Sequence, residues 1–223
     1  MKYEELYIAI LNEELKKAMG CTEPIAISYL SCVLKDLLES NPDKVDVFVS
    51  GSILKNVKSV VVPNTNGLRG IASSVAIGIV AGKKELKLEC LSEVSDEQRN
   101  KCIDYLKNVP ISVNKSDNDF VFDIHIFMYK GNDVVEGRIV DNHTNIVFLR
   151  KNENVILSKE LTNKETVSNL IDHSILSVEE IFNFAKEVDI KKIEDILLEQ
   201  IDCNMSISKA GLNAKYGANI GRT

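Results

Sequence analysis

The chain has 223 residues, of which 44% are hydrophobic and 27% are charged, so it can bury a core in one large or two small domains. Its formal net charge of -6 does not favour nucleic acid or an anionic membrane surface as a partner. No apolar run has transmembrane length, residues 1–5 do not resemble a signal peptide, and five cysteines without a CxxC pair favour a reducing compartment. We therefore expect a cytoplasmic protein.

The first third of the chain predicts helices and one strand. Residues 3–19 place apolar side chains at three- and four-residue spacing, which predicts an amphipathic helix that ends at Gly20. Residues 25–38 predict a second, more buried helix, and alternation over residues 44–50 predicts a half-buried strand. Residues 68–82 predict a helix of small residues. Such a helix allows tight helix packing or forms the floor of a small-ligand site, and the two interpretations are compatible.

The remainder predicts a small sheet between helices. Residues 95–107 indicate a short exposed helix, and from residue 110 to residue 158 the apolar period changes to two, with turn sequences at 130–133 and 151–154. Helical patterns return at 163–173, 177–188 and 190–205. We expect an α+β fold in which helical segments flank a small antiparallel β-meander. The expected division of the chain is residues 1–108, 109–160 and 161–223.

Cys21 lies at the joint between the first two predicted helices, just before Pro24, a residue suited to a first helical turn. Amide N–H groups and the positive end of a helix lower a thiol pKa, which favours the thiolate that binds metal or attacks carbon. Thr22 is the expected N-cap, and Glu23 adds favourable negative charge. The alternative is an ordinary capped helix start that includes a cysteine. Core positions are expected for the other cysteines, Cys32, Cys90, Cys102 and Cys203.

Two histidines lie in the predicted meander. His143 belongs to a polar connection at residues 141–145 and is a candidate catalytic group, with a simple turn residue as the alternative. His125 lies inside a strand, opposite the apolar side chains, and is expected to be solvated. Residues 172–174 (Asp, His, Ser) match a catalytic triad only in composition, because residues so close in sequence do not easily reach triad geometry.

Four sequence blocks stand out in order along the chain: GCTEPIA at 20–26, SGSILKN at 50–56, VPNT at 62–65 followed by Gly67, and HTNIV at 143–147. Together they resemble the L-cysteine desulfidase family, which is related to the alpha subunit of bacterial iron–sulfur L-serine dehydratase. The resemblance covers essentially the whole chain, although Ser52 replaces the asparagine expected in the second block. It implies a PLP-independent lyase with a [4Fe–4S] cluster held by three cysteines.

By this resemblance Cys21 is the first cluster ligand, and the other two belong to a C-terminal half. The chain then looks like an N-terminal half, as a split-gene product or a truncated remnant. The implied reaction is α,β-elimination on L-cysteine or L-serine, in which an iron with an open position activates the leaving group. The general base is Lys55, if it is buried, or His143, and the sequence does not choose between them. The expected substrate-binding residues are Ser50, Asn56, Asn64, Thr65 and Asn145.

The expected partners are a small L-amino acid substrate and the C-terminal half of the enzyme, with a homo-oligomer left open. Without that half we expect no lyase activity. Two alternatives remain from other classes of function. One is a non-catalytic module that binds a small amino acid without a cluster, and the other is a gene remnant without activity.

Overall fold

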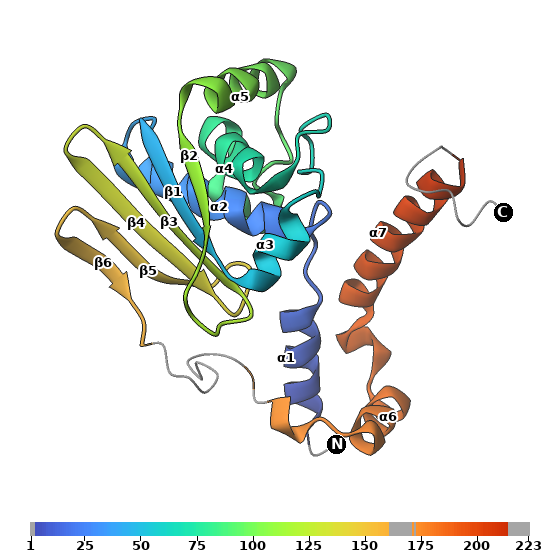
Figure 1. The fold of residues 1–223 in the computed structure, drawn as a ribbon. Coiled ribbons are helices and arrows are strands. Elements are labelled where there is room, and N and C mark those ends of the chain that lie inside the picture. The colour runs from blue at the N-terminus through green and yellow to red at the C-terminus, as the bar shows by residue number, and fades with distance from the viewer. Residues whose placement is uncertain (1–2, 161–170, 172, 214–223) are drawn as a thin grey trace. The chain divides into compact units, whose positions relative to one another are not determined.

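The computed structural model describes residues 3–160, 171 and 173–213 (Figure 1). The chain divides into two compact units, of which unit 1 combines residues 1–17 with 166–223 and unit 2 spans residues 18–165. The division expected from sequence, 1–108, 109–160 and 161–223, stays a prediction. No helix among the described residues is long and apolar enough to cross a membrane.

Unit 2 begins with helices and a strand and ends with a run of strands, and its helix α5 starts at a capping box in which Ser95 and Gln98 exchange hydrogen bonds. Helix α3 follows β1 directly and was not predicted. The elements of unit 2 are α2 (Thr22–Leu38), β1 (Lys44–Val49), α3 (Gly51–Val57), α4 (Gly70–Ala81), the 3-10 segment η1 (Lys84–Glu89), α5 (Asp96–Asn108), β2 (Ile111–Lys115), β3 (Asp123–Lys130), β4 (Asp133–Val140), β5 (Ile146–Lys151) and β6 (Asn154–Ser158).

The strands form one six-stranded sheet in the order β2-β1-β3-β4-β5-β6. Strands β3 to β6 form the expected antiparallel meander, and β1 joins it by pairing antiparallel with β3. The expected α+β class is confirmed. Strand β2 was expected to begin the meander, but it pairs parallel with β1 because α5 carries the chain back across to that edge.

Helices α2 and α4 form the core of unit 2 with one face of the sheet (Figure 1). Ile124, Ile126 and Met128 alternate inward along β3 and are fully buried. The small-residue helix packs tightly, since a Cβ atom on Gly78 would overlap the backbone of Ser28 in α2. Ser28 also donates a 2.7 Å hydrogen bond to the carbonyl oxygen of Ser74. Tight helix packing is therefore a role of residues 70–81.

Unit 1 contains α1 (Glu4–Glu14), the 3-10 segments η2 (His173–Ile175) and η3 (Ile190–Lys192), α6 (Val178–Glu187) and α7 (Glu194–Asn213). The rings of Tyr7 and Phe184 stack at 5.1 Å in its small core. The helices expected at 3–19 and 177–188 are confirmed with shorter bounds, and the one expected at 190–205 begins four residues later. Most of the helix expected at 163–173, and residues 214–223, lie outside the described residues. The buried cysteines are Cys32, Cys90 and Cys102, whereas Cys203 is only half-buried.

Candidate functional site

The first block lies at the amino-terminal end of α2. The helix begins at Thr22 with Cys21 as its N-cap, so the expected N-cap position of Thr22 is wrong by one residue. No side chain caps this helix start within the described chain. Gly20 has a φ of 147°, and a Cβ atom at Gly20 would lie 3.4 Å from the ring of Pro63. The third block, which contains Pro63, therefore lies beside the first.

The fourth block reaches the same place from the connection between β4 and β5. The hydroxyl oxygen of Thr22 and Nε2 of His143 are 2.8 Å apart, although 121 residues separate them in sequence. The ring of Phe122 packs edge-on against the imidazole, with 4.6 Å between ring centroids. Burial lowers the pKa of His143 below its ordinary value, and the carboxylate of Glu23 opposes this effect. The imidazole is therefore neutral near pH 7 and can act as a base or a hydrogen-bond partner.

The second block completes the cluster through α3. One carboxylate oxygen of Glu23 accepts a 2.9 Å hydrogen bond from the amide of Asn56. The other accepts from the thiol of Cys21 at 3.7 Å. Among the described residues, no cationic side chain forms an ion pair with Glu23. The structure thus fixes a carboxylate beside a neutral histidine, and we define the α2 site as Cys21, Thr22, Glu23, Asn56 and His143.

Cys21 differs from the expectation. Burial raises the pKa of its thiol, and the nearby Glu23 carboxylate raises it further, although a backbone hydrogen bond acts in the opposite direction. The expected thiolate is therefore not favoured, because the helix end is outweighed by burial and a neighbouring negative charge. No group of three or more His, Cys, Asp or Glu side chains in the described part of the chain is placed to hold a metal ion. The expected [4Fe–4S] cluster, for which the resemblance places only Cys21 in this chain, stays a prediction.

Four of the expected substrate-binding residues, Ser50, Asn64, Thr65 and Asn145, are engaged in the fold. Ser50 caps α3 by accepting from the amide of Ile53 and donates a 2.7 Å bond to the carbonyl oxygen of Val121. Thr65 is 3% exposed and closes its own loop by donating to the carbonyl oxygen of Val62.

Asn64 bridges its loop to α5, because its amide donates to the carbonyl oxygen of Leu91 and its side-chain oxygen accepts from Arg99. Asn145 accepts from Lys159 and donates to the carbonyl oxygen of Val140. Lys55 lies on the exposed face of α3, so the burial that its role as a base requires is absent. Of the two candidate bases, His143 lies within the α2 site.

Sequence reasoning missed how Glu23 and Phe122 contribute. The sequence predicts Glu23 only as a favourable charge at a helix end, whereas it is the anion that Asn56 orients. The sequence did mark both residues, because Glu23 lies in the first block (20–26) and Asn56 lies in the second (50–56). Phe122 gave no such signal, because it is one of several alternating apolar residues in the sequence.

The chain is similar to proteins named UPF0597 in several bacteria. It is 42% identical to the UPF0597 protein of Desulfitobacterium hafniense over 99% of this chain and 51% of that protein. Identity is 39% with the protein of Fusobacterium nucleatum and 35% with that of Treponema denticola, each over 98% of this chain and 51% of the relative. No protein-family model matches the chain, and no solved structure matches it significantly.

These relatives correct the family inferred from the four blocks. The expected membership in the L-cysteine desulfidase family is wrong, and so is the expected function as a truncated half of an iron–sulfur lyase. The relatives align along nearly all of this chain, and the names of these relatives mention neither a lyase nor an iron–sulfur cluster. The chain spans about half the length of the curated relatives it matches. By sequence, this chain is similar to UPF0597 proteins.

Proposed function

We propose that the α2 site binds a small polar molecule that carries a protonated amine and a carboxylate. The observation that supports this most is the Glu23 carboxylate, which Asn56 holds at 2.9 Å and which has no cationic partner among the described residues. A carboxylate has about four lone-pair positions, so two accepted hydrogen bonds leave room for an ammonium group.

The start of α2 supplies the complementary end for the ligand carboxylate. The first amide N–H groups of a helix have no partner within the helix, and although Pro24 has none, the amides before it favour an anion together with the positive helix end. No side chain in the described chain caps this start. The hydroxyl of Thr22 and the imidazole of His143, 2.8 Å apart, add a hydrogen-bonding pair at the same end. A small L-amino acid, the ligand expected from the sequence, combines both charged groups.

His143 gives this binding site a polar group that stays uncharged near neutral pH. A neutral imidazole does not repel the ammonium group of the ligand, and its bond to Thr22 fixes the orientation of both side chains. The proposed location of this binding is the cytoplasm, for which the support is the expected reducing compartment and the free state of Cys21 and the other described cysteines.

The test is isothermal titration calorimetry of the full chain with L-serine, and with propionate and ethylamine as probes that each lack one charged group. We expect L-serine to bind and each probe to bind at least about tenfold more weakly, since each loses one charge-assisted hydrogen-bonding group.

The matched variants are Glu23→Gln, which keeps the shape of the side chain, and Glu97→Gln on the exposed face of α5, where Glu97 pairs with Lys101 at 2.7 Å. Glu23→Gln should weaken L-serine binding about tenfold or more, and Glu97→Gln should leave it unchanged. Failure of the parent chain to bind L-serine, or equal binding by Glu23→Gln, would contradict the proposal.

A further inference from the structure

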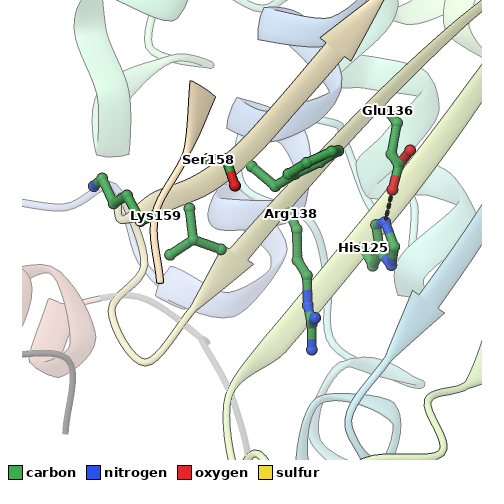
Figure 2. A pocket seen from close by; sticks show the side chains of 7 residues that line it. His125, Glu136, Arg138, Ser158 and Lys159 are labelled. Carbon is green, nitrogen blue, oxygen red and sulfur yellow. Dashed lines mark hydrogen bonds and ion pairs between the residues drawn. The ribbon is translucent and has the colours of Figure 1, made fainter. Parts of the chain in front are cut away.

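Two surfaces of the molecule differ in how their charged side chains are paired. On the outer face of the sheet in unit 2, Nε2 of His125 lies 2.8 Å from a carboxylate oxygen of Glu136 (Figure 2). The neighbouring Arg138 donates from Nε to the buried Asp123 at 2.7 Å. These groups are therefore satisfied within the chain. Helix α7 of unit 1 differs, because no described residue forms an ion pair with its charged side chains.

Helix α7 also exposes apolar side chains along one side. Its first turn packs on the small core of unit 1 through Ile196 and Leu197. Beyond that turn, Leu198, Ile201 and Met205 are 49%, 52% and 48% exposed. Their spacing of three and then four residues places them on one side of the helix, as in the seam of a coiled coil. We call these three residues the α7 stripe. Apolar side chains gathered in this way mark a contact surface, unlike single exposed ones.

Charged side chains follow one flank of the α7 stripe. Asp195, Asp202 and Lys209 recur at intervals of seven residues, so all three lie on the same flank. The corresponding positions on the other flank are uncharged and hold Leu197, Asn204 and Gly211. The charged flank is therefore acidic at the start of the helix and basic near its end.

This order of charges favours an antiparallel second copy of α7. When two such helices pair antiparallel, their charged flanks lie on the same side, and Lys209 of each copy comes beside Asp195 of the other. Asp202 lies near its own counterpart, so two attractions act against one repulsion. In a parallel pair, each charged flank would meet the uncharged flank of the other helix. Ion pairs across the interface therefore form only in the antiparallel pair.

The apolar side chains fit the same arrangement. With Lys209 beside Asp195 of the second copy, Ile201 of each copy lies level with Met205 of the other, and Leu198 lies level with Ser208. A two-fold axis repeats every contact, so the α7 stripe is complementary to itself. Charge and apolar packing thus indicate the same register.

We propose that α7 docks antiparallel against α7 of a second copy of this chain, through the α7 stripe and two Asp195–Lys209 ion pairs. The dimer is weak and reversible, because three apolar side chains per copy bury far less area than an obligate interface does. This inference does not depend on the proposed function of the α2 site.

The first test is sedimentation equilibrium of the full chain over a range of concentrations. We expect a monomer–dimer equilibrium whose dissociation constant rises at least about tenfold in Ile201→Ser, because the side chain is buried in both copies. Ile207→Ser is the matched control. Ile207 is 72% exposed on the other side of the same helix, so its replacement should leave the dissociation constant unchanged.

The second test exchanges the charges. Asp195→Lys should raise the dissociation constant about fivefold, because both ion pairs become repulsions. The double variant Asp195→Lys/Lys209→Asp should restore the parent value, since it reverses both members of each pair. Glu199→Lys makes the same change of charge on α7 away from the charged flank, and it should stay within about twofold of the parent at physiological salt.

The proposal is overturned if the parent chain stays monomeric up to about 1 mM, a limit beyond which association is negligible. It is equally overturned if Ile207→Ser weakens the dimer as much as Ile201→Ser, or if the double charge variant fails to recover the affinity that Asp195→Lys loses.

Discussion

Helix α2 of unit 2 and helix α7 of unit 1 are both long, but only α2 is built into a core. Most of the 17 residues of α2 are buried, including residues on every side of the helix from Pro24 to Cys32. In α7, none of the 20 described residues is buried. A helix that is fixed on all sides holds its first turn in one position, so the side chains there can keep a defined geometry. This difference explains why the candidate site lies at the start of α2.

The largest loss of folding stability should come from replacing Asp123, the buried carboxylate at the start of β3. Asp123 is fully buried and bonds to Arg138 and, at 2.6 Å, to the amide of Asn118. Asp123→Asn leaves the arginine without its anion and should destabilise the fold by about 3 kcal/mol. The measurement is urea unfolding. Asp104→Asn, on an exposed side chain of α5, should change stability by less than about 0.5 kcal/mol. If Asp123→Asn and Asp104→Asn lost the same free energy of unfolding, burial of the carboxylate would not determine how strongly its loss destabilises the fold.

Packing between α2 and α4 gives the next effect. A Cβ atom at Gly78 would overlap the carbonyl oxygen of Ser28, so Gly78→Ala should push the two helices apart and destabilise the protein by about 1–3 kcal/mol. Urea unfolding again provides the measurement. If Gly78→Ala were as stable as the parent, this result would contradict the close contact between the backbones of α2 and α4 at Gly78.

The third effect concerns His143 and pH. Because burial lowers its pKa, the unfolded chain binds the proton more tightly than the folded protein. Folding stability should therefore be fully present above the ordinary histidine pKa of 6.5 and should fall as the pH drops below it. His125 contributes with the same sign. His143→Gln should consequently lose less stability than the parent between pH 7 and pH 5, measured by urea unfolding at each pH. Identical pH profiles would show that His143 is not buried beside Thr22 and Phe122.

The smallest change in stability should appear in α7, and it should be a stabilisation, whereas the first two variants destabilise the protein. No atom lies within 4 Å of a Cβ atom built on Gly211. Gly211→Ala should therefore stabilise this helix by about 0.5–1 kcal/mol, because alanine loses less backbone entropy than glycine. The measurement is amide hydrogen exchange along residues 194–213, which should be slower in Gly211→Ala than in the parent because the helix is more stable. Faster exchange in the variant would contradict the open environment assigned to Gly211.

The pattern of apolar residues predicted most of the elements, because helical and strand periodicities are local properties. It did not predict that β1 would pair with β3, since strand order depends on contacts between distant segments. The four blocks did mark the neighbourhood of the α2 site, and three of them supply its side chains through Glu23, Asn56 and His143.

Individual roles were harder to predict, because a polar side chain can serve the ligand or the fold. Ser50, Asn64 and Thr65 satisfy backbone or side-chain groups within the protein, which only the three-dimensional partners reveal. Cys21 shows the same limit for electrostatics. The position at a helix start was predicted correctly, but the burial and the carboxylate of Glu23 that reverse its pKa shift depend on the folded surroundings.

The most direct test of the α2 site is to map where L-serine binds on the full chain by the change in backbone amide chemical shifts. The account predicts that the largest changes gather at residues 20–25, 54–57 and 142–145, which are far apart in sequence and meet only at the start of α2. Largest changes at other residues, with these three segments unaffected, would contradict it.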